Sequence, residues 1–372
     1  MQAEKKRQTA AVAQEGVVLV EAQQIADNLK ILKEQIHAPI MAVVKNNGYG
    51  LGLKEYALFL QRQGIEKFGV KDAREAMELR AAGISGEIYL LAPILDIPQL
   101  VRLIRADVIL SVDSAMAAGC AKRAGYLAGQ TPAVQIALDT GLGRYGFLPG
   151  QMEQAADAAL YFRLKGIYTH FAEPYRDAAF TKKQYARFLE QVEQLRGLGV
   201  QPPMLHCCAT AGALRFPQMQ MDLVRIGSGL LGRTPDAKKL GLCKVGKIGA
   251  QIVEVKELPA GWNVGYGKHA RLKKPRKVGI VQAGAQAGFF VGRQEAGVGT
   301  ARYLARAARA LLRKKRHYVN IRGQKVPVLG MVGLNHLAID LSETSCRAGE
   351  FAYAACNPVF CPEQMLRLWR EA

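Results

Sequence analysis

Short apolar segments alternate regularly with helix-patterned segments along the first two thirds of the chain, and this alternation constrains the fold more than any other feature. Eight strand candidates recur within about 190 residues, nearly all followed by a helical pattern. They are residues 40–44, 68–70, 88–92, 108–112, 133–138, 166–169, 204–205 and 223–226. Such a series predicts a parallel sheet closed into a (β/α)8 barrel. An open doubly wound sheet is the alternative. It usually has Gly-x-Gly-x-x-Gly at its first turn, which the turn after Val44 does not match.

Helix-patterned segments between these strands carry start and stop signals. Three of them begin near a residue that can cap a helix and stop at a glycine. They are residues 72–82 (Asp72, Gly83), 114–124 (Ser114, Gly125) and 181–198 (Thr181, Gly199).

The pattern changes to strands punctuated by Pro and Gly after about residue 240. The strand candidates there are residues 248–257, 277–281, 318–321, 326–329 and 337–341. One basic helix stands out, at residues 300–316. We expect it to be an amphipathic surface helix, with a membrane-surface or phosphate-binding helix as the alternative. We therefore predict a flexible tail at residues 1–16, a barrel at residues 17–240 and a mainly β domain at residues 241–372.

Composition restricts the class of protein. The net charge of +20 raises the question of nucleic acid, but the basic residues are mostly dispersed and no aromatic-interleaved basic motif is present, so we expect no nucleic-acid partner. The cysteines number seven, with no Cys-x-x-Cys, which fits a reduced cytoplasm better than a disulfide framework. Residues 1–15 lack the apolar core of a secretory signal, and no stretch approaches the length of a transmembrane helix.

Lys45 is the first charged side chain after the apolar strand 40–44, and a glycine-spaced turn with Tyr49 follows it. A lysine at the end of a buried strand loses its proton more easily, because desolvation disfavours the charged form. An uncharged lysine amine attacks carbonyls and forms Schiff bases. The alternative is an ordinary solvated lysine.

Other reactive side chains also follow strands, where a barrel places its catalytic residues. They are Asp139 to Arg144, His170, Thr210 and Arg225 with Gly227 and Ser228. The glycine loop and the threonine hydroxyl can form an anion site for a phosphate. A Schiff-base lysine, a phosphate cup and a strand-end arginine together indicate a site for pyridoxal phosphate. An arginine facing the pyridine nitrogen keeps that nitrogen largely unprotonated, which favours simple proton transfer.

Six segments, taken together and in order, resemble the motifs of bacterial alanine racemases, from about residue 17 to residue 355. They are Val43-Val-Lys-Asn-Asn-Gly-Tyr-Gly-Leu-Gly52, Asp139-Thr-Gly-Leu-Gly-Arg-Tyr-Gly-Phe147, Thr169-His-Phe-Ala172, Asp222-Leu-Val-Arg-Ile-Gly227, Asn263-Val-Gly-Tyr-Gly267 and Val328-Leu-Gly-Met-Val-Gly-Leu-Asn335.

The resemblance implies a role for each matching residue. Lys45 would hold pyridoxal phosphate and act as one base, and Tyr266, reaching in from the partner subunit of a homodimer, would be the opposite base. His170 would bridge Tyr266 and Arg225, and Arg225 would face the pyridine nitrogen. Arg144 and Leu334 would contact the amino-acid substrate. The phosphate would be held by Tyr49, Thr210, Gly227, Ser228 and Tyr353.

The match breaks at three single positions and at Gly333-Leu334-Asn335, which stands where the family has Cys-Met-Asp. Ala285 and Ala287 replace a tyrosine and an aspartate at the substrate entrance of the family, and Ala137 replaces a lysine that often braces the arginine. We interpret Lys71 and His206 as structural and the cysteines as inert.

The resemblance therefore predicts a cytoplasmic homodimer with shared active sites that interconverts L-alanine and D-alanine, by two-base proton transfer through a pyridoxal phosphate aldimine. Two alternatives remain. One is a racemase of serine or of a basic amino acid, and the other is a pyridoxal-phosphate-binding protein with little turnover.

Overall fold

The computed structural model describes residues 16–268, 270–292 and 317–371. Contacts divide the chain into two units: a barrel unit, Ala22–Val245, and a β unit, which combines the chain up to Glu21 with the chain from Gly246 onward. The predicted basic helix at residues 300–316, and residues 1–15 of the predicted tail, lie outside the described residues.

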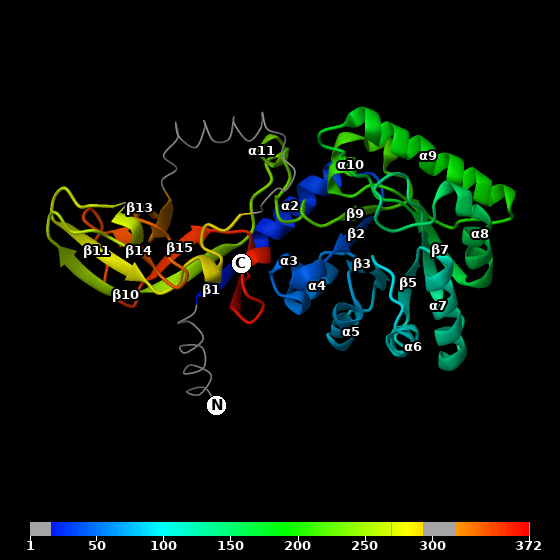
Figure 1. Ribbon diagram of the computed structural model, residues 1–372, viewed down its shortest axis with the longest axis horizontal. Helices are drawn as coiled ribbons and strands as arrows, with labels where there is room; N and C mark the ends of the chain where they lie inside the picture. The colour runs from blue at the N-terminus through cyan, green and yellow to red at the C-terminus, as the bar shows by residue number, and fades with distance from the viewer. Residues whose placement is uncertain (1–15, 269, 293–316, 372) are drawn as a thin grey trace. The chain divides into compact units, whose positions relative to one another are not determined.

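The barrel unit contains one sheet of eight strands in the order β8-β7-β6-β5-β4-β3-β2-β9 (Figure 1). Every strand pair in it is parallel. The N–H of Asp222 donates to Leu205 O at 3.1 Å and that of Arg225 to Cys208 O at 2.9 Å, so the chain after β8 joins β9 and the sheet closes. The strands are β2 Ile40–Val43, β3 Lys67–Val70, β4 Glu87–Leu90, β5 Val108–Val112, β6 Ala133–Ala137, β7 Arg163–Tyr168, β8 Leu205–His206 and β9 Val224–Ile226. The predicted (β/α)8 barrel is confirmed.

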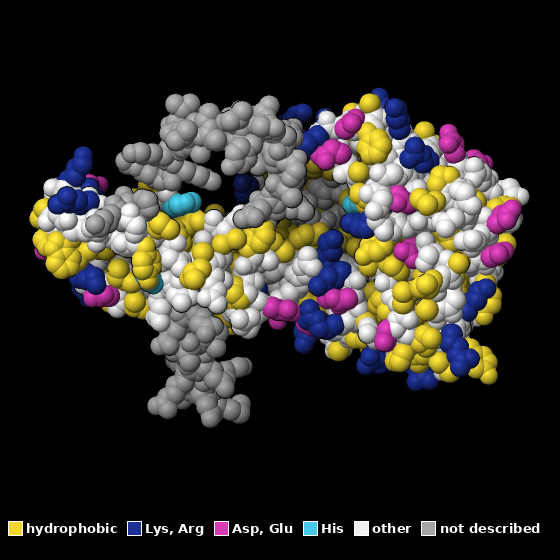
Figure 2. All heavy atoms as spheres, in the orientation of Figure 1, with side chains coloured by type: hydrophobic (Ala, Val, Ile, Leu, Met, Phe, Trp, Pro, Cys, Tyr) yellow, Lys and Arg dark blue, Asp and Glu magenta, His cyan; other side chains and the backbone are white. Residues whose placement is uncertain are grey.

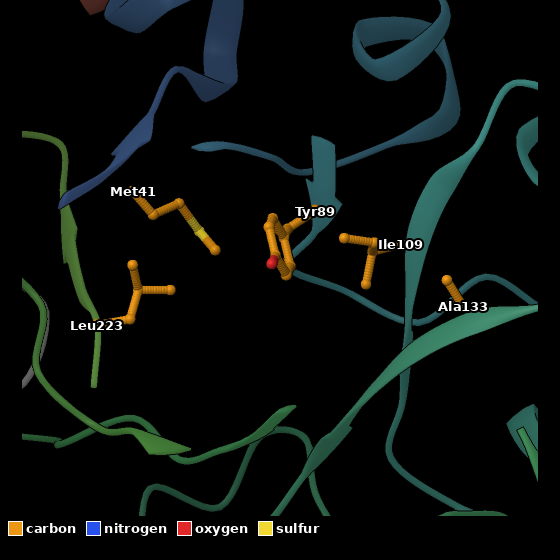
Figure 3. Close-up of a cluster of buried hydrophobic side chains, with 5 residues drawn as sticks. All are labelled: Met41, Tyr89, Ile109, Ala133 and Leu223. Atoms are coloured by element: carbon orange, nitrogen blue, oxygen red, sulfur yellow. The ribbon is translucent and has the colours of Figure 1, made fainter. Parts of the chain in front are cut away.

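Side chains fill the inside of this barrel. Met41, Tyr89, Ile109 and Ala133, from β2, β4, β5 and β6, form one buried cluster with Leu223, which immediately precedes β9 (Figure 3). Fully burying a large apolar side chain contributes about 1.5–3 kcal/mol. Because this layer closes the interior, an opening for a ligand is left toward the carboxyl ends of the strands.

Helices surround the sheet (Figure 1). Their bounds are α2 Ala22–Gln35, α3 Lys45–Tyr49, α4 Leu53–Arg62, α5 Ala73–Ala81, α6 Ile97–Arg105, α7 Ala115–Ala128, α8 Met152–Tyr161, α9 Ala178–Gly197, α10 Thr210–Arg215 and α11 Ala237–Leu240, with short 3-10 turns at Pro149–Gln151 and Pro217–Met219. Asp72 and Ser114 cap α5 and α7 as expected, since their side chains accept N–H groups of the first turn.

Two helix boundaries differ from the prediction. α9 begins at Ala178 rather than at Thr181, because the carboxylate of Asp177 accepts the N–H of Phe180 at 2.8 Å. Helix α7 continues past Gly125 and ends at Gly129, which has a left-handed φ of 71°. Gly125 serves packing instead, since a Cβ there would lie 2.7 Å from Cδ of Pro132.

The β unit contains the second sheet, in the order β11-β14-β13-β12-β15-β10-β1-β16. Because β10 pairs with both β15 and β11, part of this sheet closes on itself. The strands are β1 Val17–Glu21, β10 Lys247–Leu258, β11 Arg276–Val281, β12 Tyr318–Ile321, β13 Gln324–Leu329, β14 Leu337–Asp340, β15 Phe351–Ala355 and β16 Leu366–Arg370, with 3-10 turns at Tyr266–Lys268, Ala285–Ala287 and Pro358–Phe360.

The first strand differs from the predicted domain boundary. The prediction assigned residues 17–240 to the barrel, but β1 pairs antiparallel with β10 and parallel with β16, in the β unit. Four of its five residues are buried, and it has a strand on each side within that sheet.

Charged side chains of both signs are interspersed on the visible face of the barrel unit (Figure 2). No helix among the described residues is both long enough and apolar enough to cross a bilayer.

Candidate active site

The turn after β2 carries Lys45 and has an unusual backbone. Asn46, Asn47, Gly48 and Tyr49 all have positive φ values, of 57°, 53°, 62° and 54°, so α3 winds as a left-handed turn. Only glycine, and to a lesser degree asparagine, adopts this region at small cost. The Asn47 side chain accepts the N–H of Leu53 at 2.8 Å, which ties the turn to the start of α4. Lys45 and Tyr49 are thereby held at the two ends of one tight turn.

Tyr49 meets the glycine loop that follows β9. A Cβ at Gly227 would lie 2.3 Å from the Tyr49 hydroxyl, so only glycine fits beside it. Thr210, the first residue of α10, accepts the N–H of Gly229 at 3.3 Å, and Ser228 lies between these glycines. Burial raises the pKa of Tyr49 to about 12, so its hydroxyl remains a hydrogen-bond donor.

Arg225 of β9 lies buried among backbone carbonyls. Its Nη2 donates to Thr169 O at 2.6 Å and to Cys207 O at 3.1 Å. Its Nη1 donates to the carbonyl and to Nδ1 of His206, at 3.0 and 2.6 Å. A guanidinium with this many fixed acceptors has one orientation, and burial lowers its pKa without removing its proton.

His170 lies on the other side of Arg225, whose Nη2 is 3.4 Å from Nδ1 of the imidazole. Burial, and then the charges of Arg225, Arg144 and Lys45, lower the pKa of His170 to about 3. Burial and the charge of Arg225 also lower the pKa of His206. Both imidazoles are therefore neutral. Since an arginine only donates, Nδ1 of each ring is the acceptor and Nε2 carries the proton.

His206, which the sequence analysis interpreted as structural, supports the site through its two bonds to Arg225. Its side chain is fully buried, and its Nε2 has no hydrogen-bond partner within the described chain. The signal that could have revealed it is its place at the carboxyl end of β8, beside the strand that carries Arg225.

Arg144 extends from a loop that Asp139 organises. The Asp139 carboxylate accepts the N–H groups of Gly141, Leu142 and Gly143 at 2.8–3.2 Å. The Arg144 guanidinium lies over the Tyr145 ring, 5.4 Å from its centroid. The carboxylate of Asp139 is thus used by the loop backbone, and an aromatic ring supports the arginine.

One cavity of about 520 Å³ at the carboxyl ends of the strands brings these residues together. Its lining includes eight of the predicted site residues: Lys45, Tyr49, Arg144, His170, Thr210, Arg225, Gly227 and Ser228. Lys71, at the end of β3, also lines it, although it was interpreted as structural. Ala137 lies in the same wall.

Two family models match this chain. The N-terminal domain of alanine racemase matches residues 20–235, and the C-terminal domain of alanine racemase matches residues 245–355.

The chain belongs to the alanine racemase family.

Curated relatives and solved structures of this family are similar over most of the chain. An alanine racemase of Methylacidiphilum infernorum is 30% identical over 342 residues, which is 90% of this chain and 82% of the relative. One from Desulforamulus reducens is 35% identical over 257 residues, 65% of this chain and 68% of the relative. The crystal structure of alanine racemase from Streptomyces lavendulae, 25% identical, superposes with a TM-score of 0.81 and covers 96% of this chain and 97% of that one.

The remaining racemase-like site residues lie in the β unit. Tyr266 begins the short turn Tyr266–Lys268, and its side chain is 71% exposed. Leu334 is equally exposed, and its carbonyl accepts the N–H of Gln286, so the departures at Ala285 and Ala287 lie beside it. Tyr353, on β15, packs its ring where a Cβ of Gly249 would lie 2.4 Å away.

All seven cysteines are described, and none of them forms a disulfide. No cluster of His, Cys, Asp and Glu among the described residues has the grouping of a metal site.

Proposed function

We propose that this chain is an alanine racemase, an isomerase that interconverts L-alanine and D-alanine with pyridoxal phosphate as its cofactor. The observation that carries the proposal is the convergence of Lys45, Arg225 and the Tyr49–Gly227 pair on one cavity. Membership of the alanine racemase family and the names of the relatives support the same activity.

The barrel residues fit the proposed cofactor. The Lys45 amine is the attachment point, and the protonated Tyr49 hydroxyl, with Thr210 and Ser228, surrounds a place beside Gly227 where a side chain is excluded. Three hydroxyls and a glycine loop are suited to phosphate oxygens. Tyr353 of the β unit is proposed as a further phosphate ligand, as the family pattern implies.

Pyridoxal phosphate, when bound, supplies an electron sink that makes the α C–H of an amino acid acidic. We propose that Arg225 faces its ring nitrogen. The guanidinium can donate a hydrogen bond but does not give up its proton, so a ring nitrogen facing it would remain largely unprotonated and the sink would be limited. A weaker electron sink would favour return of the proton to the α carbon over side reactions. The fixed bonds to Thr169 and His206 keep Arg225 from turning away.

Racemisation needs one base on each face of the substrate α carbon, because each base takes or returns the proton from its own side. We propose Lys45 for one face and Tyr266 of the partner subunit for the other. The neutral His170 accepts from Arg225 at Nδ1 and presents Nε2–H. A hydrogen bond from Nε2–H to the oxygen of that tyrosine would orient it toward the α carbon.

Arg144 is the proposed ligand of the substrate carboxylate, with Leu334 as a further substrate contact. The cavity lining carries four cations, Lys45, Lys71, Arg144 and Arg225. Of its two carboxylates, Asp139 is used by its own loop and Glu173 pairs with Arg176 at 3.6 Å. This positive lining disfavours the alternative of a basic amino acid, since like charges in a partly desolvated cavity repel. The charge of the lining does not discriminate against serine, which is neutral, so serine belongs in the substrate panel.

We further propose a cytoplasmic homodimer in which each active site draws Tyr266 from the other subunit. The high exposure of Tyr266 supports this assembly, because a base must reach a reacting atom to act on it. The cysteine content, with no disulfide among the cysteines described, supports a reducing compartment. No nucleic-acid partner is proposed.

The test follows the α-proton of L-alanine in deuterated water by NMR, with chiral chromatography of the products and of a panel of L-amino acids. We expect the wild-type holoenzyme to form D-alanine with deuterium at the α carbon. Lys45→Ala should lose the visible absorbance of the cofactor and the exchange. Tyr266→Phe should keep the absorbance and lose racemisation, whereas the control Tyr126→Phe, at a tyrosine 80% exposed on α7, should keep both.

Two outcomes would overturn the proposal. Cofactor absorbance without α-proton exchange for any amino acid would identify a binding protein with little turnover. Exchange of serine or of a basic amino acid, with alanine unchanged, would identify a racemase of another specificity.

A further inference from the structure

Glu75, in the first turn of α5, is a buried carboxylate that the proposed mechanism does not use. Its side chain is fully inaccessible to solvent, although it does not line the cavity. One carboxylate oxygen accepts the N–H of Asn47 at 3.2 Å, and the other accepts the N–H of Lys71 at 3.1 Å. Glu75 therefore joins two backbone segments, the left-handed turn after β2 and the end of β3.

Placing a charge at this position is costly. Burial raises the pKa of Glu75, and the hydrogen bonds from Lys71 and Asn47 oppose that rise. An apolar side chain would fill the space without this cost. The two N–H groups, however, would then be buried without acceptors.

The turn that Glu75 holds is one that the chain does not adopt readily. Its residues from Asn46 to Tyr49 have left-handed φ values, and two of them are asparagines rather than glycines. Bonds within the turn, from Gly48 N–H to Val44 O and from Gly50 N–H to Asn46 O, close it locally at 2.9 Å each. The Asn47 N–H points outward to Glu75, so this carboxylate fixes the turn against the neighbouring strand.

We propose that Glu75 is a positioning residue for the cofactor site: its carboxylate holds the left-handed turn so that the Lys45 amine and the Tyr49 hydroxyl face the cavity together. The inference rests on the proposed function, in which those two side chains hold pyridoxal phosphate. Glu75 acts through the backbone of Asn47 and touches neither cofactor nor substrate.

Glu75→Gln tests the proposal with little change in volume. Glutamine keeps one acceptor oxygen but places an NH2 group against the second N–H, so one of the two bonds is lost. A hydrogen bond to a charged group corresponds to a factor of roughly 10–100 in an equilibrium. We expect the dissociation constant of the variant for pyridoxal phosphate, measured by titrating apoprotein, to rise by roughly 10-fold or more. The control is Glu78→Gln, one turn later on α5, where the glutamate pairs with Arg74 at 3.6 Å.

Amide hydrogen exchange of the apoprotein gives a readout that does not depend on activity. In Glu75→Gln, peptides covering residues 45–52 should exchange faster than in wild type, while peptides covering α8 should not change. Unchanged exchange at residues 45–52, or unchanged cofactor affinity, would overturn the positioning role. If Glu75→Gln does not fold, Glu75→Asp takes its place in the same two measurements. It keeps the charge but draws the carboxylate back by one methylene.

The two proposals can fail separately. If wild-type protein binds cofactor and racemises alanine while Glu75→Gln behaves like wild type, only the role of Glu75 is wrong. If wild-type protein binds no cofactor, the proposed function itself is wrong, and the exchange measurement on the turn still reports whether Glu75 holds it.

Discussion

Gly227→Ala tests the contact between the glycine loop and Tyr49 most directly. Gly227 does not have the left-handed φ that would exclude alanine, so the effect of the substitution is steric. The added Cβ would lie 2.3 Å from the Tyr49 hydroxyl, and 2.8 and 2.9 Å from two ring carbons. Ordinary carbon contacts are about 3.5–4.0 Å, so the ring or the loop must move by roughly 1 Å.

A shift of this size removes the Tyr49 hydroxyl from the place proposed for the phosphate. A hydrogen bond to a charged group contributes about 1.5–3 kcal/mol, so the affinity of the apoprotein for pyridoxal phosphate should fall roughly 10–100-fold. The assay is a fluorescence or absorbance titration of apoprotein, accompanied by thermal unfolding of the same samples. The unfolding temperature of the apoprotein should change little, because Tyr49 and Gly227 both line the cavity, which leaves room for the displaced ring.

Gly197→Ala is the matched control, since no atom lies within 4 Å of a Cβ at that glycine of α9. In a Tyr49→Phe background, Gly227→Ala should cost less than in wild type, because the hydroxyl that it displaces is already absent. Cofactor affinity equal to that of wild type in Gly227→Ala would refute the reasoning.

Three further predictions concern the loop, a histidine and a helix. Asp139→Ala removes the carboxylate that accepts three N–H groups of the loop before Arg144. Because the loop then no longer holds Arg144 in place, the KM for alanine should rise roughly 10-fold with cofactor affinity unchanged. The pKa of His170 is lowered to about 3, so the unfolded chain binds the proton first, and stability should fall by about 1.4 kcal/mol per unit as the pH drops below 6.5. Urea unfolding at pH 7 and pH 5 should show a smaller loss in His170→Gln. Gly125→Ala should lower the unfolding free energy by about 1–3 kcal/mol because its Cβ meets Pro132, whereas Gly119→Ala, with open space on the same helix, should raise it by about 0.5–1 kcal/mol in the same assay.

The barrel could be predicted because its strands are short apolar runs at regular spacing, each ending where the chain becomes polar. The same regularity located Lys45 and His170, since each follows such a run, and Arg225, the one polar residue within the run 223–226. The ends of the helices were harder to predict than the strands. Thr181 and Gly125 are residue types typical of helix ends. However, Asp177 caps α9 one turn earlier, and Gly125 lies inside α7, where it lets Pro132 pack closely.

Long-range pairing explains what the sequence did not reveal. Val17–Glu21 falls within the residues predicted for the barrel, and only its pairing with β10 and β16 assigns it to the β unit. Glu75 resembles a solvated first-turn glutamate, a common helix pattern. Its burial comes from contacts with Asn47, which lies 28 positions away along the chain.

The charges around His170 also limit how a pH profile of the enzyme can be interpreted. Burial and three neighbouring cations, Arg225, Arg144 and Lys45, all disfavour protonation of this imidazole, so it stays neutral down to about pH 3. Its Nε2–H is therefore available as a donor throughout the range in which an enzyme is assayed. A fall in rate with a midpoint above pH 5 cannot report the titration of His170. In the proposed mechanism such a fall belongs to a group other than this imidazole, and His170→Gln should leave its midpoint unchanged.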